Sequence, residues 1–217
     1  KRDSMLKQQK KYVIRGKREI EAIRNAGNIT GRTHWDAFYS DYWNESAQYF
    51  TMNETLRPDF YFDRWQREKC NPHRIFVSQG DYPLKGLHYL LLALPAIRRK
   101  YPDVKVHVAG NSLVNYTTWK DKIKISAYGK YLRSIIAQNE LQDVVTFLGS
   151  LTGAQMKEQY LEAGLFLCCS SMENSPNSLG EAMLLGVPCV SADVGGISSI
   201  FRDGQDGILF KGFKKEA

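Results

Sequence analysis

Two glutamates, Glu173 and Glu181, have the spacing in this sequence that most strongly suggests chemistry. They lie eight positions apart in "SSMENSPNSLGEAMLLGVPCVSADVGG", with a Ser-Pro pair between them. Serine followed by proline is typical of a helix start, because serine caps the first turn and proline fits its first position. The pattern therefore predicts a helix over 176–185 that begins after a cap at Ser175 and stops at Gly186.

The start of this helix is predicted to bind an anion. The backbone N–H groups of Asn177, Ser178 and Leu179 are expected to be free, and the helix dipole favours negative charge at this end. Glu181 would lie about 7 Å further along the axis. From there it could accept hydrogen bonds from both hydroxyls of a ribose whose diphosphate sits at the helix start. Glu173 would face the group that the diphosphate carries.

The elements that position these residues follow from an alternation that begins at Ile75. Short apolar runs predict strands at 75–80, 104–110, 144–150, 165–171, 188–196 and 207–212. Helical patterns lie between them, one of which is expected to run from a cap at Thr152 to a stop at Gly164. Continuous apolar strands are typical of a parallel sheet with helices on both faces. The sequence therefore predicts an α/β, Rossmann-like doubly wound domain, whose ligands bind beyond the carboxyl ends of the strands. Gly149, at one of these ends, joins the candidate binding residues.

The bulk composition is that of an ordinary globular protein, with 43% hydrophobic and 24% charged residues. Its four cysteines form no Cys-x-x-Cys pair and its histidines are scattered, which favours reduced core cysteines in a cytoplasmic protein over a metal site. The net charge of +7 indicates an anionic partner, and much of it lies in "KQQKKYVIRGKR". This stretch is either a solvated helix face or a peripheral contact with anionic lipid at the inner face of a membrane.

The segment "ENSPNSLGEAMLLGVPCVSADVGG" closely resembles the E-x7-E signature of retaining glycosyltransferases of family 4 (glycosyl transferases group 1). The resemblance extends through "IFVSQGDYPLKGLHYLLLALPAIRRKYPDVKVHVAG" and "VVTFLGSLTGAQMKEQYLEAGLFLCCSSMEN", and it covers residues 71–210 strongly. It implies the GT-B fold, in which two Rossmann-like domains face a cleft and the C-terminal one holds most of the nucleotide sugar.

The resemblance also implies a division of the chain. Residues 1–55 contain too few elements to close a core, and they are interpreted as the tail of an incomplete N-terminal domain. Residues 56–73 would be the connection, and residues 74–217 the nucleotide-sugar-binding domain. "FKGFKKEA" stops about where the family's last helices would cross back. We therefore expect the chain by itself to bind a nucleoside diphosphate without transferring sugar at a useful rate.

Roles carry over to individual residues. Glu173 resembles the glutamate that contacts the donor sugar, and Lys85 in "YPLKG" the lysine that neutralises the diphosphate, so these two are the expected catalytic residues. Glu181 resembles the glutamate that binds the ribose hydroxyls. The other expected donor-binding residues are Asn177, Ser178, Leu179 and Gly149.

Plainer interpretations exist for the same residues. Glu181 could be a solvated helix glutamate, and Lys85 a surface lysine, although a cation at a helix start opposes the dipole. Ser170 and Ser171 are expected to be packing and loop residues.

The sequence departs from the family at one position. Gly80 stands where members often carry an arginine, so that Ser78, Gln79 or another arginine would have to compensate.

The implied reaction transfers a sugar from a nucleotide diphosphate to an acceptor hydroxyl with retention of configuration, in polysaccharide or glycan biosynthesis. The donor would be a UDP-, GDP- or ADP-sugar, and the acceptor a glycan or a lipid-linked molecule. No cofactor or metal is expected, because Lys85 and the helix start would stabilise the leaving diphosphate. Nucleic acid is not expected, because the tryptophans are not interleaved with a basic stripe. A non-catalytic nucleotide-sugar-binding module and a GT-B-like nucleotide-sugar epimerase remain alternatives.

Overall fold

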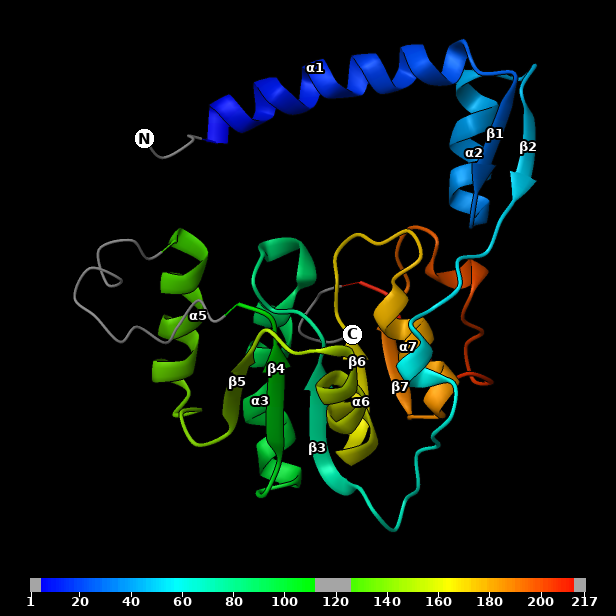
Figure 1. The fold of residues 1–217 in the computed structure, drawn as a ribbon. Helices are drawn as coiled ribbons and strands as arrows, with labels where there is room; N and C mark the ends of the chain where they lie inside the picture. The colour runs from blue at the N-terminus through cyan, green and yellow to red at the C-terminus, as the bar shows by residue number, and fades with distance from the viewer. Residues whose placement is uncertain (1–4, 112–125, 213–217) are drawn as a thin grey trace. The chain divides into compact units, whose positions relative to one another are not determined.

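The computed structural model of this protein describes residues 5–111 and 126–212 (Figure 1). The chain divides into two compact units, Lys1–Glu54 and Thr55–Ala217. The stretch 56–73, predicted as a connection, is thus part of the second unit. The end of the chain, to which the expected truncation refers, includes residues 213–217, which lie outside the described residues.

The described residues of the first unit form four elements: α1 (Met5–Arg24), β1 (Asn28–Gly31), α2 (His34–Trp43) and β2 (Gln48–Thr51). The two strands pair in parallel. Thr33 caps α2, because its hydroxyl accepts from the Asp36 N–H while the Asp36 carboxylate accepts from the Thr33 N–H, each at 3.2 Å. Asn44 ties the ends of the two helices together, since its side-chain amide donates to the carbonyl of Ile23 at 2.8 Å.

In the second unit, the residues that the structure describes form one six-stranded sheet. Its strands are β3 (Asn71–Val77), β4 (Lys105–Ala109), β5 (Val145–Gly149), β6 (Ala163–Cys168), β7 (Cys189–Ala192) and β8 (Ile208–Phe210). They lie in the order β5-β4-β3-β6-β7-β8, and all neighbours are parallel. Figure 1 shows β5, β4, β3, β6 and β7 in this order from left to right. All six predicted strands are confirmed. The chain starts at β3, builds outward to β5, and then returns to place β6 on the other side of β3.

Helices cover both faces of this sheet. They are α3 (Leu87–Lys100), α5 (Ala127–Gln138), α6 (Gly153–Glu162) and α7 (Asn177–Leu185), with short 3₁₀ turns η1 (Pro58–Phe60), η2 (Pro83–Lys85) and η3 (Ile197–Ser199). One core cluster joins α3 and α5 to the sheet, and a second joins α6, α7 and η1 to it. The predicted doubly wound α/β fold is therefore confirmed. Among the described residues, every helix is too short or too polar to cross a membrane.

The start of α7 differs by one residue from the prediction. Pro176 has an extended conformation, with φ −70° and ψ 117°, and occupies the cap position that was expected for Ser175. The helix therefore begins at Asn177. Its predicted stop is confirmed, because Gly186 adopts the left-handed conformation at φ +77°.

One of the two predicted boundaries of α6 is confirmed, and the other is wrong. Thr152 caps the helix as predicted, in a reciprocal pair with Gln155. Gly164 does not stop it, because α6 ends at Glu162 and Gly164 lies inside β6. A Cβ at Gly164 would lie 2.3 Å from the carbonyl oxygen of Pro72, so this glycine permits the close approach of β6 to β3.

The cysteines are free thiols, and three of them are buried. Cys168 ends β6, Cys169 follows it, and Cys189 begins β7. Burial raises the pKa of Cys169 and of Cys189 to about 12, so these thiols stay protonated and unreactive at neutral pH. Their predicted role as core residues is confirmed.

Candidate active site

The candidate site lies at the carboxyl ends of β3, β6 and β7. β3 and β6 are adjacent in the sheet, and the order of the chain reverses between them. In open α/β sheets, ligands bind at such a reversal, because the connections on its two sides lead away from each other. Lys85 follows β3 and Glu173 follows β6, so both come from the loops that flank this point.

The structure brings Lys85 and Glu173 together. The Lys85 Nζ lies 2.6 Å from the Glu173 Oε1, and the two side chains are 25% and 13% exposed. The Ser170 hydroxyl donates to the same carboxylate oxygen at 2.7 Å. Ser170 was expected to be a packing residue, but it orients Glu173. Because an ammonium group has three N–H donors, the pairing leaves Lys85 with capacity for an anionic ligand.

Backbone contacts hold the Lys85 loop against the Glu173 loop. The N–H of Ser171 donates to the carbonyl of Leu84 at 2.8 Å. Gly86 adopts φ +72°, and a Cβ there would lie 1.8 Å from the carbonyl oxygen of Cys169. A side chain at position 86 is therefore excluded both by the backbone conformation and by space.

A second glycine contact joins the loop after β7 to Glu173. Gly195 has φ +56°, and a Cβ on it would lie 1.9 Å from the Glu173 carbonyl oxygen. The Gly196 N–H donates to that same oxygen at 3.1 Å. The backbone of Glu173 is thus fixed from one side by the β7 loop, and its carboxylate from the other by Ser170 and Lys85.

The predicted anion-binding residues lie in the first turn of α7. Asn177 is only four residues from Glu173, a span of at most about 14 Å. The expectation of a free N–H does not hold for Leu179, which donates to the carbonyl of Pro176 at 3.0 Å and has a fully buried side chain. The contribution of Asn177 and Ser178 to a phosphate site stays a prediction.

Glu181 is buried and paired, which sequence reasoning did not anticipate. It is 3% exposed, and its two carboxylate oxygens accept from the Arg57 Nε at 2.8 Å and Nη2 at 2.9 Å. The hydroxyl of Tyr160 lies 3.5 Å from the Oε2. The alternative of a solvated helix glutamate is therefore wrong.

Arg57 and Tyr160 are the functional candidates that sequence reasoning missed. Arg57 lies 124 positions before Glu181, and no local pattern connects them. The hydrogen bond to Glu181 raises the pKa of Arg57. Burial raises the pKa of Tyr160 well above its ordinary value, and the charge of Glu181 adds to this, so Tyr160 acts as a neutral phenol.

Gly149 lies at the same edge of the sheet but further away. It ends β5, two strands from β3, which is about 10 Å at the usual strand spacing. Its carbonyl accepts from the Gly110 N–H at 2.9 Å, and its φ is +76°. The structure does not place it in contact with Lys85 or Glu173, and its role in donor binding stays a prediction.

Packing explains the departure at Gly80. A Cβ there would lie 2.6 Å from the Val108 side chain of β4 and 2.7 Å from the Leu87 side chain of α3. An arginine at this position would have to displace the core beneath the site. The side-chain amide of Gln79, one of the suggested substitutes, donates to the hydroxyl of Tyr82 at 2.8 Å.

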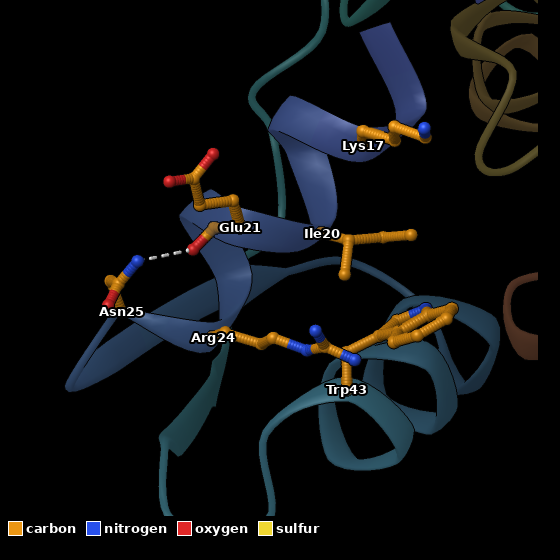
Figure 2. A pocket seen from close by; sticks show the side chains of 6 residues that line it. All are labelled: Lys17, Ile20, Glu21, Arg24, Asn25 and Trp43. Atoms are coloured by element: carbon orange, nitrogen blue, oxygen red, sulfur yellow. Dashed lines mark hydrogen bonds between the residues drawn. The ribbon is translucent and has the colours of Figure 1, made fainter. Parts of the chain in front are cut away.

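A separate hollow of about 450 Å³ lies in the first unit, beside α1 and the end of α2 (Figure 2). The guanidinium of Arg24 lies 5.4 Å from the centre of the Trp43 ring in its wall. The other residues that line it are Lys17, Ile20, Glu21 and Asn25. It contains none of the predicted site residues.

A parallel sheet with the order reversal at β3 and β6, and with charged residues gathered at that point, defines the second unit as a Rossmann-like ligand-binding domain. The family model described as Glycosyl transferases group 1 matches residues 60–217. The match covers most of the chain, and the protein belongs to this family.

Curated relatives resemble the chain over part of their length. The putative colanic acid biosynthesis glycosyltransferase WcaL of Salmonella typhimurium is 25% identical over 217 residues, which cover 91% of this chain and 52% of the relative. Spore coat protein SA of Bacillus subtilis is 27% identical over 132 residues, which cover 60% of this chain and 33% of the relative. The chain thus spans about half of the one relative and a third of the other.

Solved structures agree with the expected GT-B fold. Sucrose-phosphate synthase from Thermosynechococcus elongatus has a TM-score of 0.72 at 18% identity, over 92% of this chain and 49% of that one. Anabaena Alr3699/HepE, in complex with UDP and glucose, has a TM-score of 0.70 at 20% identity, over 90% of this chain and 52% of that one. At these identities the similarity concerns the fold.

Proposed function

We propose that the second unit binds the nucleotide-sugar donor of a retaining glycosyltransferase that acts in polysaccharide or glycan biosynthesis. The observation that carries this proposal is the Lys85–Glu173 pair at the reversal point of the sheet, four residues before the start of α7. It is supported by the family, by a relative named for colanic acid biosynthesis, and by a structural neighbour in complex with UDP and glucose.

In this proposal the donor diphosphate lies between Lys85 and the first turn of α7. When the sugar departs, negative charge builds on the diphosphate, and the ammonium group and the helix dipole stabilise it. Glu173 faces the sugar, where a carboxylate stabilises an oxocarbenium-like transition state. Glu181 accepts hydrogen bonds from the ribose hydroxyls. The charge on the diphosphate is offset without a metal.

The donor proposal is tested by calorimetry of the chain with UDP, GDP and ADP. We expect one of them to bind, and we expect Glu181→Gln to weaken that binding by about 1.5–3 kcal/mol, because a charge-assisted pair of hydrogen bonds is lost. Glu162→Gln is the matched control, since Glu162 ends α6 at the opposite edge of the sheet. Unchanged affinity in Glu181→Gln would remove this residue from the site.

Release of sugar from the donor separates the proposal from a non-catalytic module, which releases none, and from an epimerase, whose sugar stays on the nucleotide. The acceptor of a GT-B enzyme enters between two domains, and this chain spans about half of WcaL. We therefore propose that it hydrolyses its donor slowly at most when tested with nucleotide sugars. Nuclear magnetic resonance of the released sugar would report retention by its initial anomer. Robust transfer by these 217 residues would contradict this part of the proposal.

We also propose that α1 makes a peripheral contact with anionic lipid. Its sequence has seven Lys or Arg against two Glu, and Leu6, Tyr12 and Val13 are exposed along it. A basic helix with exposed apolar side chains suits the surface of an anionic bilayer.

Sedimentation with vesicles tests this contact. Binding to vesicles that contain phosphatidylserine should weaken about fivefold in Lys10→Gln, because each surface cation contributes about 1 kcal/mol. Lys105→Gln, in β4 of the second unit, should leave it unchanged. Equal binding to neutral vesicles would argue against the electrostatic contact.

A further inference from the structure

The stretch that begins the second unit lies along α7, the helix that carries Glu181. The backbone N–H of Trp65 donates to the carbonyl of Leu185 at 2.7 Å. The Arg64 Nη1 donates to the carbonyl of Leu184 at 3.0 Å. Both contacts satisfy carbonyls at the C-terminal end of α7, which have no partner within the helix. Arg57, at the other end of this stretch, reaches the helix at Glu181.

Three features hold Arg57 in place. It precedes Pro58, which restricts its backbone to the extended region, and its φ of −61° and ψ of 142° lie there. Its guanidinium lies 4.9 Å from the centre of the Phe60 ring, and Phe60 is fully buried. Its Nε and Nη2 each donate to one oxygen of Glu181. The Arg57 side chain is nevertheless 45% exposed, whereas that of Glu181 is 4% exposed, so the arginine lies at the surface beside a buried carboxylate.

Arg57 and Glu181 form a bidentate pair, and this geometry determines which lone pairs of the carboxylate stay open for a ligand. A carboxylate offers about four lone-pair directions, and a bidentate arginine uses one on each oxygen. The remaining direction on the Oε1 suits one ribose hydroxyl. On the Oε2 the Tyr160 hydroxyl lies 3.5 Å away, so a second ribose hydroxyl would share this oxygen with it. The same fork supplies a counter-charge to a carboxylate that is 3% exposed, and without it that charge would be buried unpaired.

We propose that Arg57 is a positioning residue of the nucleotide site: it fixes the Glu181 carboxylate in the orientation that accepts the ribose hydroxyls. This inference rests on the proposed donor-binding function. It assigns a task in the donor site to a residue of the stretch between the two predicted domains.

The test takes whichever of UDP, GDP and ADP binds the whole chain and compares its dissociation constant with that of its 2′-deoxy analogue. We expect the wild type to bind the ribonucleotide at least tenfold more tightly, since the deoxy compound lacks one hydrogen bond to Glu181. Arg57→Gln should bring this ratio close to one. Arg57→Lys keeps the charge but loses the fork, and its ratio should be intermediate. A purely structural role would lower both affinities and leave the ratio unchanged.

Arg64→Gln is the matched control, because Arg64 comes from the same stretch and contacts α7 at a backbone carbonyl away from Glu181. It should keep the wild-type ratio. If the wild type does not bind UDP, GDP or ADP, the proposed function fails. If it discriminates and Arg57→Gln discriminates equally, the inference is overturned.

Two further outcomes are decisive. Tighter binding of the ribonucleotide by Arg57→Gln with an unchanged ratio would identify Arg57 as a competitor for Glu181 and reject the positioning role. If Arg57→Gln does not fold, the ratio for Arg57→Lys decides. If neither single variant folds but the double variant Arg57→Gln/Glu181→Gln does, the ion pair serves only the stability of the fold, and the inference is rejected.

Discussion

Replacing Gly86 by alanine is expected to lower the free energy of unfolding of the second unit by about 2–5 kcal/mol. The left-handed conformation at φ +72° costs a residue with a Cβ about 1–2 kcal/mol. In addition, the new methyl group would lie 1.8 Å from the carbonyl oxygen of Cys169, so the two loops would have to move apart at a further cost of about 1–3 kcal/mol. This is a large fraction of the stability of a typical domain.

Gly186→Ala is the matched control for this experiment. Gly186 has nearly the same conformation, φ +77°, but a Cβ there would meet no described atom within 4 Å. It should therefore lose about 1–2 kcal/mol, the cost of the conformation by itself. Urea unfolding of both variants measures the difference. Equal losses would mean that the contact between Gly86 and Cys169 does not constrain the loops.

Replacing Lys85 by alanine is expected to weaken the binding of a nucleoside diphosphate about 100-fold or more. One part of this loss is the charge-assisted hydrogen bond between the ammonium group and the phosphate, about 1.5–3 kcal/mol. The other part comes from Glu173, which lies 2.6 Å from Lys85 and would keep its hydrogen bond from Ser170 but lose its counter-charge beside the diphosphate. The variant should also bind with a weaker dependence on salt.

The double variant Lys85→Ala/Glu173→Gln separates the two parts. Removing the Glu173 charge should restore part of the affinity, although it restores no contact with the phosphate. Lys105→Ala is the control, since Lys105 begins β4 at the opposite edge of the sheet. Calorimetry with the nucleotide that binds best would measure all three. Wild-type affinity in Lys85→Ala would exclude the phosphate role.

The two ion pairs of the site have the same arrangement, a glutamate paired with a cation that is distant in the sequence. Each of the two glutamates is held by a cation from a distant part of the chain: Glu173 by Lys85, and Glu181 by Arg57. A carboxylate that is oriented before the ligand arrives loses less conformational freedom on binding. The proposed donor site is thus expected to be rigid at its carboxylates, and its affinity for a nucleotide should respond to the partner cations as well as to the glutamates.

The sequence by itself determined the elements and the fold class. Six apolar runs became the six strands, and Thr152 and Gly186 bounded their helices as predicted, because capping and left-handed turns depend on residues that are neighbours in the chain. The spacing of Glu173 and Glu181 also placed one outside and one inside α7. The sequence did not determine which residue caps α7. Ser175 was the predicted cap, but Pro176 occupies that position and the helix begins one residue later.

Only the tertiary structure decided which side chains meet. Lys85 and Glu173 are 88 positions apart and Arg57 and Glu181 are 124 apart, and their contacts depend on strand order and on the path of the stretch along α7. Periodicity carries no information on either. The same holds for Gly80, since the atoms that exclude a side chain there come from β4 and α3. A glycine in a sequence indicates that a close contact or a left-handed conformation is possible at that position. Only the atoms around it in the folded chain show which of the two requires it.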